Sequence, residues 1–345
     1  MHHTKSIIHL GVAVLAAGAL SLRCPAQTTS SDGPATTALA AGKFTFNARL
    51  RWENADQANL RESNAFTLRT RFGFTSAPVD GWQAMIEGEN LTVIGNPGNY
   101  NAAGTNPGGA GRTVIADPPE TGINQAWLSY TMADATLKAG RERIVLDNAR
   151  FVGDVGWRQN QQTFDAATLT LQPSTDLTVF YGFVSRVSRV FGNKPGQPDF
   201  NSNSSLVNLT YRGLPASTLT AYAYLLDFAN SAANSSDTYG ASFTGARVLT
   251  KSLKLTWRAE AATQSDAANN PLSYRASYVA AEIGGAIAPF EFTAGGEVRG
   301  SDHGTKGFAT PLATGHACNG GAEGFLATPA KGLRDRYASL GVAIP

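Results

Sequence analysis

Cysteine, histidine and charged residues are scarce in this sequence. Its 345 residues include two cysteines and five histidines, and Asp, Glu, Lys and Arg together make up 16%. No group of Cys or His has metal-ligand spacing, and no glycine-rich loop opens a helix as a phosphate-binding loop does. The sequence therefore predicts no metal and no cofactor, and nothing in it indicates binding to nucleic acid.

Long apolar runs are missing beyond the N-terminus. Apolar residues make up 42% of the chain and the mean hydropathy is -0.16, yet no later run approaches the roughly 20 apolar residues of a membrane-spanning helix. Helical membrane spans are therefore not expected. Near-neutral hydropathy together with 36 glycines instead fits strands that present one apolar and one polar face.

The N-terminus has the pattern of a secretory signal. His2, His3 and Lys5 provide a positive start, and an apolar core follows over residues 10–22. We expect a signal peptide over residues 1–26, and a flexible leader rich in Thr, Ser, Ala and Pro over residues 27–42.

Export has two consequences for the remaining chain. Cleavage removes Lys5 and Arg23 but no acidic residue, so 28 minus 2 leaves 26 basic residues against 26 acidic ones. Any preference for anions must therefore come from where the arginines lie. Cys318 is then the one remaining cysteine, so no disulfide within the chain is expected.

Strand-like alternation begins at residue 43. In KFTFNARLRWE, Phe44 and Trp52 fall on an apolar face, and Arg49 and Arg51 fall on a polar face. A period of two with this contrast predicts a strand with one lipid-facing side. Fourteen strands are predicted, over residues 43–53, 65–75, 81–90, 122–132, 135–144, 164–171, 177–185, 204–212, 217–228, 238–246, 252–264, 274–287, 290–300 and 335–343.

Short and long connections between these strands alternate along the chain. Turns at positions such as Pro78, Asp134 and Pro289 alternate with long segments such as residues 91–121 and 301–334. An up-and-down barrel in the bacterial outer membrane has this asymmetry, because its periplasmic turns are tight and its external loops are long. We therefore predict an all-β, transmembrane, up-and-down antiparallel β-barrel over residues 43–345.

The segment LKAGRERIVLDNARFVGDVGWRQNQQTFD, residues 137–165, interrupts the strands with many polar residues. Its arginines have few apolar neighbours and suit a water-filled lumen, so the segment is predicted to constrict a pore. One difficulty is that Leu137 has the same parity as Arg141, and a β-bulge at Gly140 would place the two side chains on different faces. The alternative is an ordinary loop whose arginines are solvated.

Arginines on the expected inner face are the candidate site. Because they stay charged at any relevant pH and can grip carboxylates with two hydrogen bonds, they would attract anionic solutes. Acidic residues such as Glu87, Glu89, Glu142 and Asp165 could instead pair with them, which would leave little selectivity. The predicted pore-lining, substrate-binding residues are Arg49, Arg51, Arg69, Arg71, Arg141, Arg143, Arg150 and Arg158.

Two other functions are open to a barrel of this kind. An outer-membrane hydrolase would need a catalytic group, and Asp302 beside His303 is the one candidate proton-transfer pair, without a nucleophile or second acid. We therefore do not expect an enzyme. A barrel for surface display or adhesion would use its long loops, such as residues 91–121, to bind a partner outside.

Several stretches resemble the alginate-export family of Gram-negative outer-membrane porins. They are GRERIVLDNARFVGDVGWRQNQQTFDA at residues 140–166, LTAYAYLLDF at 219–228, QSDAANNP at 264–271, and the segment over residues 304–335. The resemblance implies an outer-membrane channel for small or polymeric solutes that are anionic or sugar-like, including an alginate-type polyuronate. It also implies lipid, lipopolysaccharide and the barrel-assembly machinery as partners.

The chain departs from this family at two places. Family members continue further and end on a strand with a terminal aromatic residue, whereas this chain ends at Pro345. We expect a truncated barrel that would have about eighteen strands when complete. Cys318 stands at a loop position where a bulky residue is expected.

Overall fold

A computed structural model describes residues 33–106, 108–192, 196, 198–250, 253–319 and 327–342. The predicted signal peptide and residues 343–345 lie outside this part. In the described part no helix has the length and apolar character needed to cross a membrane.

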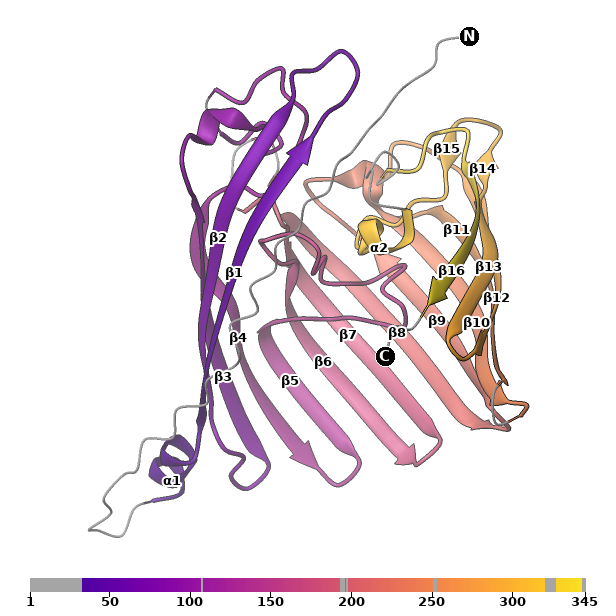
Figure 1. Cartoon of the computed structure of the whole chain (residues 1–345). Helices are drawn as coiled ribbons and strands as arrows, with labels where there is room; N and C mark the ends of the chain where they lie inside the picture. Colours follow the sequence, from indigo (N-terminus) through magenta and orange to yellow (C-terminus); the bar gives the residue numbers. More distant parts are fainter. Residues whose placement is uncertain are drawn as a thin grey trace.

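Fourteen antiparallel strands form one curved sheet in chain order (Figure 1), which confirms the predicted fold class. The strands are β1 (Lys43–Ala55), β2 (Ser63–Thr75), β3 (Trp82–Val93), β4 (Glu120–Met132), β5 (Ala135–Glu142), β6 (Thr163–Ser174), β7 (Leu177–Ser188), β8 (Phe200–Leu214), β9 (Ser217–Leu226), β10 (Ser236–Val248), β11 (Leu253–Asp266), β12 (Arg275–Ile287), β13 (Phe290–Arg299) and β16 (Leu333–Val342). Every strand pairs with its neighbour in sequence, except that β13 pairs with β16 across the small β14 (Ser301–Asp302) and β15 (Lys306–Gly307) hairpin. The sheet is open, since no ladder within the described residues joins β1 to β16.

Four short helical segments lie outside the sheet within the described residues. They are α1 (Pro34–Ala40), η1 (Pro97–Asn99), η2 (Ala232–Asn234) and α2 (Gly315–Asn319), and the last of these lies between β15 and β16. Helix α1 falls within the predicted leader and is tied to the turn after β2, because Ala77 donates its backbone N–H to Ala38 O at 3.0 Å. The domain boundaries remain predictions.

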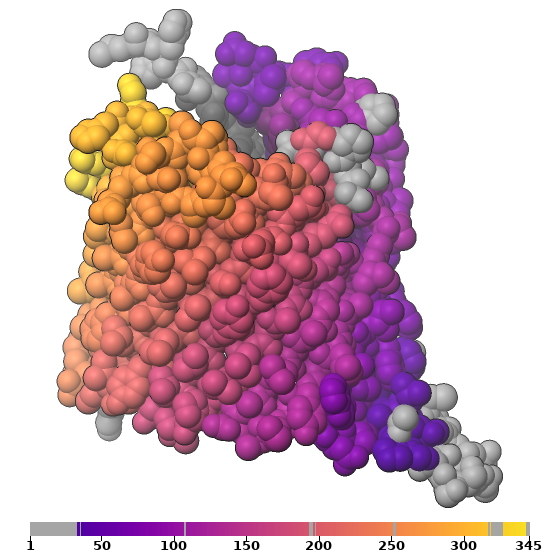
Figure 2. All heavy atoms as spheres, turned by 180° about the vertical axis from the view of Figure 1, so that it is seen from behind, coloured from indigo at the N-terminus to yellow at the C-terminus, as the bar shows by residue number. Residues whose placement is uncertain are grey.

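The outer face of the sheet is apolar, as the alternation predicted. On β1 and β2 the outward row includes Phe46 (43% exposed), Trp52 and Phe72 (60% exposed), and the inward row carries the arginines. Seen from behind, the outer face is a continuous surface of oblique strands (Figure 2). In lipid, every backbone N–H and C=O of such a strand must be hydrogen-bonded within the protein. The ladders between neighbouring strands provide these hydrogen bonds.

The inner face is packed at one end and hollow at the other. Along β1 the inward side chains are exposed near Lys43 and buried at Arg51 and Glu53. The buried end is the end of the long connections, and the same gradient is present on β6 and β8. The interior is therefore filled near the long loops and open to water near the short turns.

Candidate functional site: a loop across the barrel interior

The connection between β5 and β6, residues 143–162, lies against the concave face of the sheet (Figure 1). It begins where β5, the shortest strand of the large sheet with 8 residues, ends at Glu142. We call it the constriction loop. The loop contacts β1 and β2 on one side and β12 and β13 on the other. It therefore spans the interior.

Arginines of β1 and β2 hold the first side of the loop. Arg51 donates to Trp157 O at 2.7 Å, Arg49 donates to the same oxygen at 3.1 Å, and Arg69 donates to Gln159 O at 3.4 Å. These guanidinium groups satisfy carbonyl oxygens of a loop that has no strand partner there, and buried carbonyls require such partners. The inward-facing arginines of β1 and β2 therefore form the surface on which the constriction loop binds.

A buried group of two cations and two anions reinforces this side. Arg51 and Arg158 both pair with Glu53, and both lie 3.6 Å from Asp117. Their side chains are between 1% and 8% exposed. Because charges this deeply buried need partners, the four groups fix one arrangement of the loop on β1.

Asp117 brings a second loop into the interior. It lies near the end of the long connection between β3 and β4, and its carboxylate accepts the backbone N–H of Gln159 at 2.8 Å. Nearby, Tyr100 donates its hydroxyl to Asp117 O at 2.8 Å. Burial, together with the Asp117 carboxylate, raises the pKa of Tyr100, so this donor stays neutral. The rest of this connection packs on the β1–β2 hairpin, with Arg61 and Arg112 in a parallel bridge.

The opposite side of the loop is held at β13. Arg150 Nη2 lies 2.6 Å from Glu297 Oε1, with side chains 1% and 8% exposed. Burial lowers the pKa of Arg150, but Glu297, Cys318 and Tyr278 together outweigh this effect and raise the pKa overall, so the guanidinium stays charged. Tyr278 Oη also donates to Glu297, at 3.2 Å.

Phe151, the next residue, packs into an aromatic cluster on the inner face. Its ring centroid lies 5.1 Å from that of Tyr222, 5.3 Å from Tyr278 and 5.9 Å from Phe308. Aromatic packing of this kind adds to the free energy of area burial. The loop therefore carries an apolar anchor beside its buried ion pair.

The segment between β13 and β16 covers the constriction loop from a third direction. Gly153 donates its N–H to Leu312 O at 2.9 Å. The ring of His316 stacks on that of Trp157 at 3.8 Å and 7°, and Arg51 Cζ lies 4.6 Å from the Trp157 centroid. Trp157 thus joins a guanidinium and an imidazole from distant parts of the chain.

The remaining predicted arginines are distributed differently. Arg71 pairs with Glu89 on the inner wall, and Arg143, with a side chain 48% exposed, pairs with Asp154 of the same loop. Arg141 forms a two-bonded pair with Asp165. Of the acidic partners that the sequence indicated, Glu89 and Asp165 thus pair with arginine.

Arg141 lies on the row of Leu137, not on the inner row. The ladders from β5 to β4 and β6 run through Gly140 without a register shift, so the expected bulge is not found. Gly140 has φ 128, and a Cβ there would meet Ala126 O at 2.2 Å. Close backbone contact with β4, rather than a change of face, explains this glycine.

Several residues that hold the loop were not among the predicted candidates. They are Glu53, Asp117, Phe151, Gln159 and Glu297, with exposures from 0% to 8%. The alternation on β1 puts Glu53 on the same row as Arg51 and was a signal for that pair. No local pattern pairs Arg150 with Glu297, which is 147 residues away.

Comparison with known protein families identifies the family of this chain. The model of the alginate export family matches residues 41–284, and the chain belongs to this family. A search of curated protein sequences gave no match.

Solved outer-membrane porins have a similar fold. Pseudomonas aeruginosa OccD3 (OpdP) is 12% identical with a TM-score of 0.57, over 76% of this chain and 58% of that one. Pseudomonas aeruginosa OccK9 (OpdG) is 12% identical with a TM-score of 0.62, over 76% of this chain and 68% of that one. Pseudomonas aeruginosa OpdK, solved with vanillate, is 12% identical with a TM-score of 0.61, over 75% and 67%. The chain thus spans between 58% and 68% of the length of these three structures.

Proposed function

We propose that this protein is a passive channel in the Gram-negative outer membrane, narrowed by the constriction loop. The observation that carries the proposal is that one loop is anchored to both sides of the inner face. Arg51 of β1 bonds Trp157 O and Arg158 of the loop pairs with Glu53 of β1, and on the other side Arg150 pairs with Glu297 of β13. A plug of this kind leaves room for solutes only beside the loop, so the side chains around it set what passes. Family membership and the porin-like fold support the same function, and neither indicates an enzyme.

The eight predicted arginines then have different roles. Arg51, Arg150 and Arg158 are buried in ion pairs and hold the loop in place. Arg71, Arg141 and Arg143 are paired as well. Within the described residues, Arg49 and Arg69 take part in no ion pair, and their hydrogen-bond partners are neutral oxygens.

Arg49 and Arg69 therefore supply positive charge that no carboxylate contacts directly, although Asp117 and Glu53 lie near Arg49 and Glu87 and Glu89 lie near Arg69. Such a field attracts anions into a narrow lumen and lowers the barrier to their passage. We propose that the solutes are anionic or sugar-like, carboxylated sugars above all. The similar porin OccK2 (OpdF), 13% identical with a TM-score of 0.57, was solved in complex with glucuronate, which supports this class of solute.

Reversal potentials in planar bilayers test the proposal. Folded protein under a KCl gradient should give stable current steps with a preference for chloride. The R49Q/R69Q double variant should lose most of that preference, while R212Q, which removes an exposed arginine near the short turns, should keep it. Steps with an unchanged reversal potential in R49Q/R69Q would exclude the arginine-based selectivity. Folded protein without any steps would exclude the channel and favour surface display.

A further inference from the structure

The wall of the barrel is incomplete beside the end of β5. Strand β4 pairs with β5 only from Ala126 toward the short turns, and its residues 120–125 have no partner in β5. Strand β6 pairs with β5 only as far as Phe164. Because β5 ends at Glu142 and the chain turns inward, this part of β4 has a strand on one side only, and a space is left beside it.

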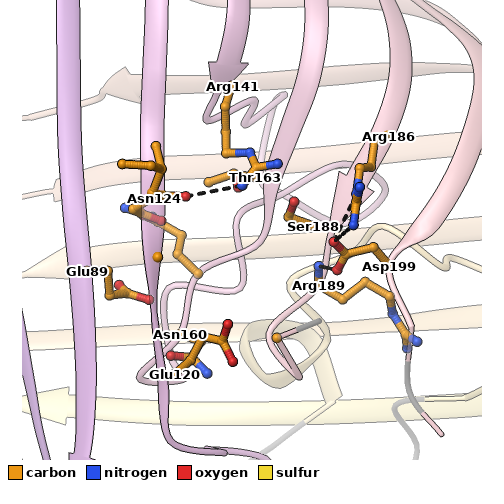
Figure 3. Close-up of a pocket in the computed structure, with 14 residues that line it drawn as sticks. Glu89, Glu120, Asn124, Arg141, Asn160, Thr163, Arg186, Ser188, Arg189 and Asp199 are labelled. Carbon is orange, nitrogen blue, oxygen red and sulfur yellow. Dashed lines mark hydrogen bonds and ion pairs between the residues drawn. The ribbon is translucent and has the colours of Figure 1, made fainter. Parts of the chain in front are cut away.

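A polar cavity of about 320 Å³ occupies this space (Figure 3). Asn160 of the constriction loop and Glu120 of β4 lie on one side of it, and Ser188, Arg186 and Asp199 lie on the other. The volume is at the lower end of the range for small-molecule sites, which is roughly 300–1,000 Å³. The cavity therefore has room for one small molecule.

The charged groups that line the cavity balance. They are three cations and three anions, namely Arg141, Arg186, Arg189, Glu89, Glu120 and Asp199. Arg141 pairs with Asp165 of β6. Arg186 pairs with Asp199, and the Arg189 guanidinium stacks on two phenylalanine rings. Each arginine is thus already engaged, and an anionic ligand would also meet the carboxylates, so the cavity fits an uncharged ligand better than an anion.

Two polar atoms of this cavity have no hydrogen-bond partner among the residues that the structure describes. They are Asn160 Oδ1, on a residue 3% exposed, and the buried hydroxyl oxygen of Ser188. The amide nitrogen of Asn160 donates to Pro118 O and Val190 O, both at 3.0 Å, so the amide is held in place with its oxygen unbonded. A buried acceptor without a partner is costly, and a ligand hydroxyl would satisfy it.

The cavity opens where the apolar band of the outer face ends. The outward row of β5 changes from Leu137, which is 54% exposed, to the ion-paired Arg141. On the neighbouring strands, the side chain of Asn90 donates to Thr121 Oγ1 at 2.6 Å. Charged and amide groups avoid hydrocarbon, and this is the end of the long connections, which in barrels of this kind lies outside the cell. The mouth therefore faces the external medium.

We propose that this cavity binds one ring of an uncharged saccharide from the external medium. Each sugar hydroxyl both donates and accepts hydrogen bonds. One ring can therefore donate to Asn160 Oδ1 and to the Glu120 carboxylate, and it can accept a hydrogen bond from Ser188 Oγ. The existing ion pairs stay intact, because a neutral ligand brings no charge that would compete for them.

Other small ligands fit the cavity less well. A carboxylate or a phosphate would have to displace Asp165 or Asp199 from its arginine. A metal ion would lie among three guanidinium groups. An apolar molecule would leave Asn160 Oδ1 without a partner. A ligand rich in hydroxyl groups and without charge is the class that satisfies the lining as it stands.

The bound sugar would act on the constriction loop through Asn160. This side chain joins three connections, since it belongs to the β5–β6 loop and bonds Pro118 of the β3–β4 connection and Val190 after β7. A ligand that hydrogen-bonds Asn160 only in this arrangement stabilises the arrangement. Binding should therefore slow the opening of the constriction loop. The binding site itself does not depend on the channel function.

Saturation-transfer NMR on the folded full chain tests the proposal. The detergent is lauryldimethylamine oxide, which carries no sugar, and the probes are the methyl glycosides of glucose, galactose and mannose. At least one should give a saturable signal, and methyl glucuronide, the charged counterpart of the glucoside, should bind more weakly than the best of them. At saturation with that glycoside, hydrogen exchange in residues 143–162 should slow several-fold.

Substitutions at Ser188 tie the signal to the cavity. S188A removes a hydroxyl that has no partner among the described residues, so it should leave the folded barrel intact and weaken binding roughly two- to tenfold, the value of one neutral hydrogen bond. S188L fills the cavity and should abolish binding. The control is S185A on the same strand, because Ser185 does not line the cavity and bonds Asp165 O instead; it should bind as the wild type does.

Four results would overturn the proposal. One is the absence of a saturable signal from all three glycosides with folded wild-type protein, which would leave the cavity to water. Another is equal binding by wild type and S188L. The third is tighter binding of methyl glucuronide than of every neutral glycoside. The fourth is binding without any change of exchange in residues 143–162, which would exclude contact with Asn160. Current steps in planar bilayers without sugar are independent of these results, so the channel and the saccharide site fail separately.

Discussion

Arg150 and Glu297 form an ion pair in the barrel interior, with 2.6 Å between Nη2 and Oε1 and almost no exposed surface. One residue belongs to the constriction loop and the other to β13, 147 residues later. The pair therefore fixes the position of the loop relative to a strand at the far side of the sheet. A second buried group fixes the other side of the loop: Arg158 of the loop and Asp117 of the β3–β4 connection lie against Arg51 and Glu53 of β1.

Replacing Arg150 by Met should release one side of the loop. Glu297 would keep Tyr278 Oη at 3.2 Å and Arg299 at 3.5 Å but lose its closest cation. Breaking a buried pair in this way costs about 3–5 kcal/mol. The midpoint temperature of heat-modifiable gel migration should fall for R150M, and R212M should keep the wild-type value. Equal midpoints for both variants would show that the pair does not hold the loop.

Replacing Asp117 by Asn should loosen two loops together. Asp117 is 1% exposed. Its carboxylate lies 3.6 Å from both Arg51 and Arg158 and accepts the backbone N–H of Gln159. Loss of its charge leaves Glu53 as the one acid for two buried cations, at a cost of about 3 kcal/mol. Limited proteolysis should cut D117N faster than wild type within residues 143–162. The exposed D56N is the control, and the account is contradicted if D117N resists the protease as wild type does.

Trp157 should couple the constriction loop to α2. Its ring lies between His316 and Arg51, and contacts of a cation with an aromatic face are worth about 0.5–2 kcal/mol. W157A should speed hydrogen exchange in residues 311–319, whereas W157F retains a ring and should change exchange less. Identical exchange in W157A and wild type would assign the stacking no role in holding α2.

Gly140 should tolerate no side chain. At φ 128 a Cβ would lie 2.2 Å from Ala126 O and 2.8 Å from Trp127 Cα. Backbone strain of this type costs about 1–3 kcal/mol before the clash is counted. G140A should give little folded barrel on refolding into detergent, and G88A, with no neighbour closer than 3.9 Å, should give the wild-type yield. A normal yield for G140A would show that β4 and β5 can separate at this point.

Strand positions were predictable because a sheet between lipid and water imposes a period of two. Each predicted strand has its counterpart in the structure, and the ends differ by a few residues; β8, for example, begins at Phe200 rather than at residue 204. The alternation of long and short connections followed from the chain crossing the membrane back and forth. Both the alternation of side chains and the lengths of the connections are visible in short stretches of sequence, so they could be predicted without knowledge of distant contacts.

Positions inside the barrel were less predictable. Charge and parity placed Arg49, Arg51, Arg69 and Arg71 on the inner row, and the structure places them there beside the loop. The partner of Arg150 depends on how the loop crosses to β13, which no local pattern encodes. Arg141 was expected beside the loop, but the chain passes Gly140 without a bulge, so its side chain bridges β4 and β6 instead.

The conductance of single channels tests the central claim, that the constriction loop narrows the lumen, most directly. Residues 145–160 are replaced by a short Gly-Ser link, and residues 267–272 of another long connection are shortened as a control. We expect a several-fold larger conductance for the first variant and the wild-type value for the second. Unchanged conductance in a folded channel that lacks residues 145–160 would contradict the account.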